Sequence, residues 1–314
     1  MISKKARIYI AGHTGLVGSS LLSKFKEKGY TNIITRTHSE LDLTRQEMVE
    51  KFFDEEKPEY IIIAAAKVGG IKANMSHQTE FLYENLMIQN NLIWMSHVKG
   101  VKKLLFLLSS CIYPRDCPQP MKEKYLLTGE LEATNEGYAI AKIAGLKLCE
   151  YISKKFKKEF ICAMPATIYG PNDKFDPEVS HVLPALIKKI SDAKKNNLSS
   201  VEIWGTGNVK REFLYVEDLA DALFFLMQNY HSSEFINVGI GRDITVRDLV
   251  NEICNKTGFE GKIVFDTSRP DGMPRKLLDS SKIKSLGWEP KTSLDDGLKY
   301  TIEWFKKNEK NITK

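Results

Sequence analysis

The sequence lacks the features that mark membrane and secreted proteins. No apolar run in its 314 residues approaches the roughly 20 residues that span a bilayer. The N-terminal segment MISKKARIYIAG holds only the short apolar run IYIA, which is too brief for the core of a signal peptide and leads into a glycine loop. We therefore expect no membrane partner and a cytoplasmic location.

Cysteine is scarce and shows no pairing pattern. The five cysteines are an odd number, form no CxxC pair and have no histidines at the spacing of a zinc site. This pattern argues against a disulfide framework and against a structural metal site. We expect reduced thiols at Cys111, Cys117, Cys149, Cys162 and Cys254.

Internal repeats and nucleic-acid motifs are missing as well. The absence of an internal repeat argues against a solenoid. The net charge of +6 is not accompanied by a known nucleic-acid-binding motif, so we expect no nucleic-acid partner. Lysine clusters such as KKFKK are most simply solvated faces. The positive charge also suits a small anionic substrate.

What the first half of the chain does contain is a strict alternation of strand and helix patterns. This order predicts parallel pairing, and runs that are apolar on both faces, such as YIIIAAA, belong inside a sheet covered by helices. Residues 1–170 are therefore predicted to form a Rossmann-like, doubly wound α/β domain. The predicted strands are 6–11, 32–36, 60–66, 102–110 and 159–168, and the predicted helices are 16–29, 44–57, 80–100 and 138–156.

The alternation becomes irregular after about residue 170. Helix patterns begin at His181 and recur near 217–230, 245–257 and 293–308, with short strand patterns between them. We expect residues 171–314 to form mainly a second, smaller α/β lobe that binds the substrate. Some of its segments are expected to return to the large sheet.

Three glycines connect the first predicted strand to the first predicted helix. They stand three residues apart in AGHTGLVGSS. Glycines at such a turn let the backbone approach a pyrophosphate, and the free N–H groups and dipole of the helix N-terminus favour an anion there. The motif in this context predicts a dinucleotide cofactor bound by Gly12, Gly15, Leu16, Val17 and Gly18.

The end of the second predicted strand indicates which dinucleotide binds. An acid about 20 residues after the glycines would meet a ribose 2′-hydroxyl, whereas Arg36 stands there and suits a 2′-phosphate. We therefore expect NADP(H). Arg36 could instead be a solvated loop charge, and Asp42 could either meet the adenine amino group or cap the next helix.

A tyrosine and a lysine share one face of a later predicted helix. Tyr138 and Lys142 are four residues apart in NEGYAIAKIAG. An adjacent lysine cation favours the phenolate and moves a tyrosine pKa from about 10 toward neutrality. Tyr138 could then protonate a carbonyl oxygen as hydride reaches the carbon, while Lys142 holds the nicotinamide ribose and a serine hydroxyl fixes the oxygen.

The serine is expected where the fourth predicted strand ends, because open α/β sheets bind ligands at the carboxyl ends of their strands. There the sequence reads LLFLLSSCIYP. If strand geometry persists to Cys111, Ser109 and Cys111 point to one face and Ser110 to the other. The alternative for Cys111 is a buried, inert thiol.

Specific motifs cover nearly the whole chain: AGHTGLVG, AAAKVGGI, SSCIYP, NEGYAIAKIAGLKLCE, YGPNDKFDPEVSHVLPALI, REFLYVEDLA and PDGMPRKLLD. By these motifs the chain resembles the extended short-chain dehydrogenase/reductases, and among them the GDP-L-fucose synthase family. The resemblance implies an NADPH-dependent 3,5-epimerase/4-reductase of a GDP-4-keto-6-deoxy sugar, in nucleotide-sugar synthesis for surface polysaccharide.

The resemblance assigns catalytic roles at matching positions. The family's serine, tyrosine and lysine fall on Ser109, Tyr138 and Lys142, its epimerisation cysteine on Cys111 and its histidine on His181. A keto group at carbon 4 acidifies the protons on carbons 3 and 5, so inversion needs a base on one side and a proton donor on the other. Cys111 and His181 fit these roles.

The resemblance also implies ligand contacts. Arg211 is implied as a diphosphate or sugar contact, Trp204 as a neighbour of the nucleotide, and Arg275 and Lys276 as further substrate contacts. Asn85 matches a family position near the cofactor. Trp204 could equally be a half-buried strand aromatic, and Asn85 a core amide.

Departures from the family pattern leave the substrate open. Thr14 stands where many relatives have arginine, and Ala166 and Thr167 stand where they have threonine and asparagine. A second hypothesis is therefore a 4-ketoreductase of a related GDP-4-keto-6-deoxy-heptose that does not epimerise, and a third is a non-catalytic NADP-binding sensor. Family habit implies a homodimer, with the helices at 75–98 and 138–156 forming a four-helix interface.

Overall fold

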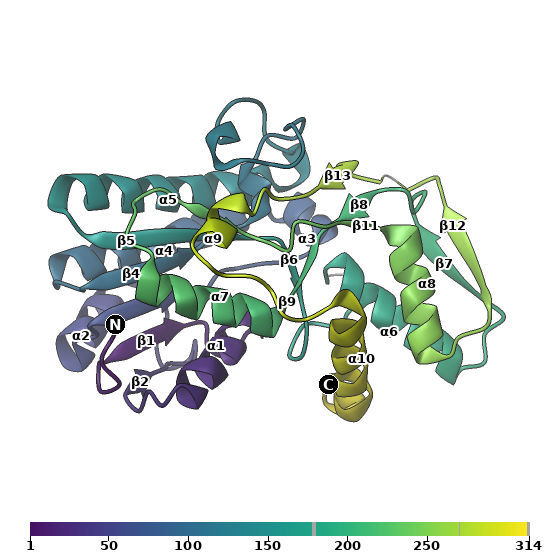
Figure 1. The fold of residues 1–314 in the computed structure, drawn as a ribbon, viewed down its shortest axis with the longest axis horizontal. Helices are drawn as coiled ribbons and strands as arrows, with labels where there is room; N and C mark the ends of the chain where they lie inside the picture. Colours follow the sequence, from purple (N-terminus) through teal and green to yellow (C-terminus); the bar gives the residue numbers. More distant parts are fainter. Residues whose placement is uncertain (178–179, 270, 313–314) are drawn as a thin grey trace.

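The computed structural model describes residues 1–177, 180–269 and 271–312 (Figure 1). Glu178, Val179 and Pro270, which belong to two of the motifs above, lie outside the described residues. Within the described ranges, no helix combines the length and the apolar character needed to cross a membrane.

The larger part of the molecule is built on a six-stranded sheet in which every neighbouring pair is parallel. Its centre is apolar on both faces, because β-branched and leucine side chains fill strands that helices cover. The Rossmann-like prediction is therefore confirmed. The strand order is β10 (Ile236–Val238), β5 (Glu159–Pro165), β4 (Lys103–Leu107), β3 (Tyr60–Ile63), β1 (Ile8–Ala11) and β2 (Ile33–Ile34).

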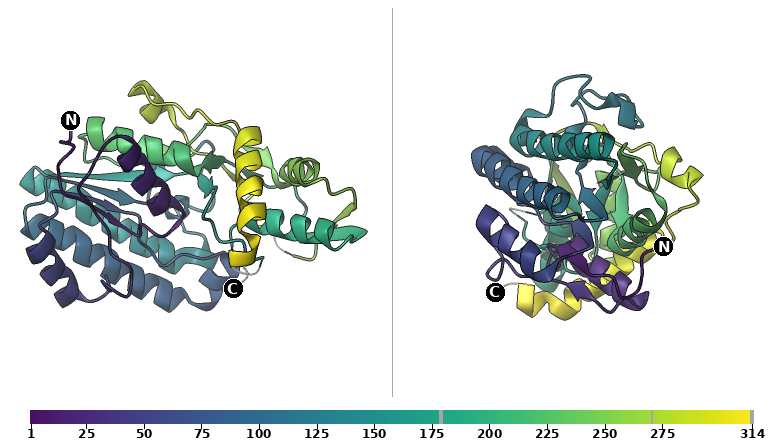
Figure 2. Two further views of the ribbon diagram at one scale, coloured as in Figure 1. Left: turned by 90° about the horizontal axis from the view of Figure 1, so that it is seen from below. Right: turned by 90° about the vertical axis from the view of Figure 1, so that its left-hand side faces the viewer.

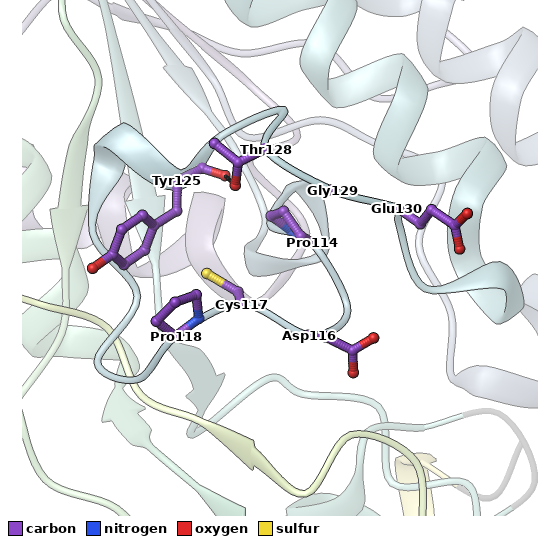
Figure 3. A pocket seen from close by; sticks show the side chains of 8 residues that line it. All are labelled: Pro114, Asp116, Cys117, Pro118, Tyr125, Thr128, Gly129 and Glu130. Atoms are coloured by element: carbon purple, nitrogen blue, oxygen red, sulfur yellow. Dashed lines mark hydrogen bonds between the residues drawn. The ribbon is translucent and has the colours of Figure 1, made fainter.

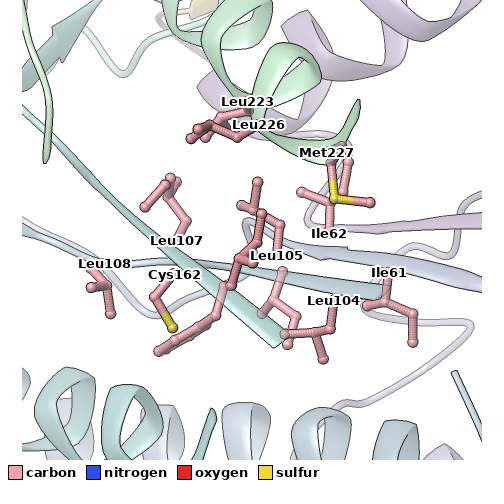
Figure 4. Packing of buried hydrophobic residues seen from close by; sticks show 14 of the residues in the cluster. Ile61, Ile62, Leu104, Leu105, Leu107, Leu108, Cys162, Leu223, Leu226 and Met227 are labelled. Atoms are coloured by element: carbon pink, nitrogen blue, oxygen red, sulfur yellow. The ribbon is translucent and has the colours of Figure 1, made fainter. Parts of the chain in front are cut away.

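Helices cover both faces of this sheet (Figure 2). Figure 4 shows Leu223 and Leu226 on one side of the sheet, above strand residues such as Leu105, whereas Cys162 points to the other side. Complete burial of a leucine contributes about 1.5–3 kcal/mol, so this layer contributes much of the stability of the fold. One face carries α1 (Leu16–Glu27) and α7 (Val216–Asn229), and the other carries α2 (Gln46–Glu56), α4 (Gln78–Val98) and α5 (Glu136–Phe156).

The predicted strand 159–168 is in fact two strands. β5 ends at Pro165, and β6 (Thr167–Tyr169) pairs with β9 (Phe213–Tyr215) outside the large sheet. The turn is held at Ala166, whose N–H donates to Val238 O at 2.9 Å, and at Thr167, whose N–H donates to Glu212 O at 3.2 Å. The chain therefore leaves the large sheet here and enters the second core.

The second core lies among α6 (Val182–Lys195), α8 (Val246–Thr257) and α10 (Leu294–Ile312). It also includes the parallel pair β7 (Ser200–Trp204) and β12 (Lys262–Asp266). Residues of α7, β10 and α9 (Ser281–Ser285) belong to the larger core instead. A small sheet orders β11 (Ile244–Thr245), β8 (Lys210–Arg211) and β13 (Arg275–Lys276), and the short helix α3 (Ile71–Ser76) precedes α4.

The strand order reverses beside β1. The chain passes from β1 to β2 on one side and then to β3 on the other, so β1 and β3 flank a switch point. Ligands of open α/β sheets bind in the crevice outside the carboxyl ends of strands at such a point. The glycine loop after β1 and the loop after β3 meet there.

Candidate active site

The glycine loop is packed too tightly for side chains. Gly12 has φ of +83°, and a Cβ there would lie 2.7 Å from Ala65 N; a Cβ on Gly18 would lie 2.0 Å from Gly12 O. Gly15 is the N-cap of α1 and offers no side chain to the first N–H groups, which include those of Leu16 and Val17. A bare, close backbone before a helix N-terminus fits a dinucleotide pyrophosphate.

Arg36 is already partnered in this structure. Its guanidinium forms an ion pair with Glu56, donates to Thr35 O at 2.7 Å and lies 5.8 Å from the ring centroid of Phe52. About one third of the side chain stays exposed, so a 2′-phosphate could compete with Glu56 for it.

Asp42 stabilises the turn before α2. Its Oδ1 accepts hydrogen bonds from Thr44 N at 2.9 Å and from the Thr44 hydroxyl at 2.7 Å, and these bonds lower its carboxyl pKa. The N-cap of α2 is Arg45, so Asp42 does not cap that helix directly. No described interaction brings Asp42 to the other predicted site residues.

Asn85 is a buried amide with both ends bonded. Its Oδ1 accepts from Lys67 N at 2.9 Å, and its Nδ2 donates to Lys67 O at 3.0 Å and Phe81 O at 2.7 Å. The side chain therefore fixes the loop that follows β3 at the switch point. These bonds fit the alternative of a core amide, and no described interaction brings Asn85 to the other predicted site residues.

Lys142 is buried beside Tyr138. Its Nζ donates to Leu107 O at 2.9 Å and lies 5.8 Å from the ring centroid of Tyr138. Burial lowers the pKa of Lys142 to about 8, against an opposing effect of Cys111. The carbonyl at the end of β4 thus sets the position of the ammonium.

The pKa of Tyr138 differs from the expectation. Burial raises it well above its ordinary value, and the nearby Cys111 raises it further. The expected shift toward phenolate was wrong because desolvation by burial dominates the pKa of Tyr138 in this site. Tyr138 is therefore a phenol at neutral pH, which is the form that can give a proton to a carbonyl oxygen.

The condition set for Cys111, that strand geometry persists to this residue, is not met, although the thiol still lies next to Ser109. β4 ends at Leu107, Ser109 is the last extended residue, and residues Ser110–Ile112 form a 3₁₀ turn. A three-residue turn, and not strand alternation, brings the thiol back to Ser109. The Ser109 side chain lies close enough to the Cys111 thiol to lower its pKa.

Cys111 is a buried thiol among charged groups. Burial raises its pKa, while the hydrogen bond from Ser109 and the charges of Lys276 and Lys142 offset part of the rise. Lys276 comes from β13 in the second part of the chain. The thiol therefore lies where both parts of the molecule meet.

Lys276 connects Cys111 with His181. Burial lowers the pKa of Lys276, and the charges of Cys111, Arg211 and Glu132 act on it in turn. His181 is the N-cap of α6 and keeps solvent-exposed surface, yet the protein around it lowers its pKa and Lys276 lowers it further. The imidazole is therefore neutral at pH 7.

Arg211 and Lys276 are held side by side by strand pairing. β8 and β13 are parallel, with Lys276 in register with Arg211. Burial lowers the pKa of Arg211, and Asp271 opposes this shift. Two desolvated cations next to each other favour an anionic ligand.

Two other predicted contacts lie apart from this group. Arg275 forms an ion pair with Asp243, one residue from Lys276 and hence on the opposite face of the strand. Trp204 is half-exposed at the end of β7, with the Arg269 guanidinium 5.0 Å from its ring centroid. No described interaction joins either side chain to Cys111 or Tyr138.

Sequence reasoning missed two acidic neighbours of the basic pair. Glu132 raises the pKa of Lys276, and Asp271 raises that of Arg211. Asp271 also accepts hydrogen bonds from Thr206 N and Oγ1, both at 2.7 Å, which fixes the loop after β7. Nothing in the sequence distinguishes either carboxylate from surface acids.

A hollow in the described part of the molecule lies away from these residues. A cavity of about 510 Å³ lies within the loop of residues 114–130, and Cys117 and Tyr125 point toward it (Figure 3). Among the described residues that line it, none belongs to the predicted site. The candidate site is therefore defined by the electrostatic contacts above and not by this cavity.

Known proteins match this architecture. Residues 8–239 match the NAD dependent epimerase/dehydratase family. The chain is 54% identical to GDP-L-fucose synthase 1 of Arabidopsis thaliana over 98% of this chain and 95% of that protein. Among solved structures, the GDP-L-fucose synthetase from Naegleria fowleri bound to NADP has a TM-score of 0.93 at 28% identity, covering 100% of this chain and 98% of that one.

A reductase is similar as well. The GDP-mannoheptose C4 reductase MlghC from Campylobacter jejuni with NADP bound has a TM-score of 0.90 at 40% identity, covering 98% of this chain and all of that one. The identity to the plant protein is higher and extends over nearly the full length. The resemblance found in the sequence motifs is confirmed: the chain belongs to the NAD-dependent epimerase/dehydratase family, in its GDP-L-fucose synthase branch.

Proposed function

We propose that the protein is an NADPH-dependent 3,5-epimerase/4-reductase that converts GDP-4-keto-6-deoxymannose into GDP-L-fucose, a sugar donor for surface polysaccharide. The observation that carries the proposal is the position of the Cys111 thiol beside Ser109 and Tyr138, with Lys276 linking it to His181. A reductase needs only the phenol, the lysine and the serine. A thiol and an imidazole around the same pocket supply the two groups that epimerisation adds.

In reduction, Tyr138 gives a proton to the oxygen on carbon 4. Its raised pKa keeps the phenol protonated, and Ser109 holds the same oxygen by a hydrogen bond. Lys142 holds the nicotinamide ribose from its fixed place at the end of β4. NADPH, held by the glycine loop and by Arg36, supplies the hydride to carbon 4 when bound.

In epimerisation, the pKa directions assign the proton donor and the base. Cys111 has a raised pKa and is a neutral thiol at pH 7, whereas His181 has a lowered pKa and is a neutral imidazole. His181 therefore removes a proton from carbon 3 or carbon 5, and Cys111 returns one to the other face. Ser109 and Tyr138 stabilise the enolate oxygen in between.

Residues 171–314 hold most of the nucleotide sugar, whereas residues 1–170 bind NADPH. Arg211 and Lys276 bind the diphosphate, because they are adjacent, desolvated cations. Trp204 offers a half-exposed ring to the guanine base. Arg275, already paired with Asp243, is a secondary contact.

A second candidate is a 4-ketoreductase of a GDP-4-keto-6-deoxy-heptose that does not epimerise. The similarity to MlghC favours it, as does Ala166 at a position implied to touch the substrate. Product analysis by NMR separates the two. With GDP-4-keto-6-deoxymannose and NADPH we expect GDP-L-fucose. A 6-deoxy product with unchanged configuration at carbons 3 and 5 contradicts the proposal.

The enzyme is proposed to act as a cytoplasmic homodimer. Five free thiols, one of them catalytic, suit a reducing compartment. α4 and α5 pack against each other and expose Tyr83, Trp94, Ile140 and Tyr151, large apolar side chains of the kind that pair with a second copy. Light scattering is expected to give the dimer mass for the wild type and the monomer mass for Trp94→Asp; a monomeric wild type contradicts the dimer.

A further inference from the structure

The turn before Tyr138 presents one side to the candidate site. Residues Ala133–Asn135 form a 3₁₀ turn that continues directly into α5. Asn135 is the N-cap of α5 and stands three residues before Tyr138, and the N-cap and the third helical residue lie on the same side of a helix start. Glu132, which begins the 3₁₀ turn, acts on Lys276, and Cys111 acts on Tyr138. Both ends of this segment therefore border the candidate site, and Asn135 lies between them in the chain.

The Asn135 amide makes no hydrogen bond to the part of the chain that the structure describes. Asn135 is the N-cap of α5, a position at which an asparagine side chain normally accepts a hydrogen bond from the second or third helical N–H. Here it forms no cap bond, and among the described residues its Oδ1 is buried with no partner. A buried acceptor without a partner is unfavourable unless a bound group supplies one.

Gln78, from the first turn of α4, caps α5 in its place. Gly137 is the second residue of α5, and its N–H donates to Gln78 Oε1 at 3.1 Å. Gln78 Nε2 in turn donates to Ala133 O at 2.9 Å, so one side chain spans the turn. A Cβ on Gly137 would lie 2.7 Å from Gln78 O, so the two helix starts are in direct contact.

We propose that Asn135 binds the hydroxyl on carbon 3 of the sugar, and that Gln78 is a positioning residue that keeps the Asn135 amide free for it. The inference rests on the proposed function. Tyr138 meets the oxygen on carbon 4, and the hydroxyl on carbon 3 is the one hydroxyl on a neighbouring carbon. An amide can donate and accept, and it turns easily about χ2 to present either end.

Two substrates test the contact: GDP-4-keto-6-deoxymannose and its 3-deoxy analogue. Asn135→Ala and Asn135→Ser are expected to lower kcat/KM about tenfold for the first and to leave it within twofold for the second. Serine is a good N-cap, so the second variant keeps the helix start. Asn229→Ala, which removes an amide at the far end of α7, is the control without effect.

Equal losses with both substrates, or no loss with either, overturn the contact. If the wild type itself turns over neither substrate, the proposed function has failed and this inference falls with it. If the wild type is active and only the substrate dependence is absent, the inference alone has failed.

A double-mutant cycle tests the role of Gln78. Gln78→Ala frees the Gly137 N–H, so Asn135 turns to cap it and the KM for the first substrate rises severalfold. In the Asn135→Ala background the same change is expected to add nothing to KM. Gln228→Ala, which removes a comparable bridge between Ile2 N and the Tyr30 hydroxyl, lowers Tm and leaves KM unchanged. Additive effects of the two substitutions on KM, or a change in Tm alone for Gln78→Ala, overturn the positioning role of Gln78.

Discussion

Lys276 lies in register with Arg211 across the parallel pair of β13 and β8. The positive charge of Arg211 lowers the pKa of Lys276, so the two cations oppose each other when no anion is bound. A bound diphosphate would relieve this repulsion and satisfy both groups. The pairing of two very short strands thus places side by side the two cations that we propose bind the diphosphate.

Loss of one of these cations is expected to weaken substrate binding. Arg211→Met raises the KM for the nucleotide sugar about tenfold or more, because a charge-assisted hydrogen bond to phosphate is lost. Lys210→Met, which removes an exposed cation at the preceding position of β8, is the matched control. Steady-state kinetics check this, and a KM that shifts equally in both variants contradicts the assignment.

The pH dependence of proton exchange follows from Cys111 and His181. His181 must be neutral to act as the base, and its pKa lies below the ordinary 6.5, so exchange is lost only as the pH falls below about 6.5. Cys111 must be protonated, and its pKa lies above the ordinary 9.0, so exchange is lost only above about pH 9. Deuterium exchange measured across pH is therefore expected to be flat in between. A loss of deuterium exchange on the acid side that already begins above pH 6.5 contradicts these roles.

Lys142 is expected to control the alkaline side of the pH profile of ketone reduction. In the proposed mechanism the ammonium holds the cofactor ribose, and because the pKa of Lys142 is about 8 the positive charge is lost as the pH rises through that value. The kcat/KM for ketone reduction is expected to fall above about pH 8, since this parameter reports groups of the free enzyme. Rates of NADPH oxidation between pH 6 and 10 check this; an unchanged rate up to pH 9.5 contradicts it.

Arg36 and Glu56 together set the response to the 2′-phosphate. Arg36→Ala is expected to raise the KM for NADPH about tenfold while leaving that for NADH unchanged, because only NADPH carries the phosphate. Glu56→Gln removes the competing carboxylate and is expected to lower the KM for NADPH. Equal effects on both cofactors would show that Arg36 acts on the fold and not on the phosphate.

Much of the larger domain could be predicted because its signals are local. The apolar runs that became β1, β3 and β4, and the glycines between β1 and α1, are adjacent in sequence to what they pack against. The alignment of Tyr138 with Lys142 follows from helix periodicity alone. Such features need no knowledge of distant contacts.

The details that failed depend on tertiary context. The apolar run into Leu108 does not reveal that the chain turns at Ser110, and the motif around Tyr138 does not reveal that burial raises the pKa of this tyrosine. Strands of two residues, such as β8 and β13, carry no periodic signal, so the pairing of Arg211 with Lys276 was not predictable.

The most direct test of dual activity is deuterium incorporation in heavy water without NADPH, followed by NMR of GDP-4-keto-6-deoxymannose. We predict exchange at carbons 3 and 5 by the wild type and by Cys117→Ser, whose thiol lies in the loop cavity, and a loss of at least about 100-fold in Cys111→Ser. Cys111→Ser should still reduce an added ketone with NADPH. No exchange by the wild type, or undiminished exchange by Cys111→Ser, would contradict the role of this thiol and leave simple ketone reduction.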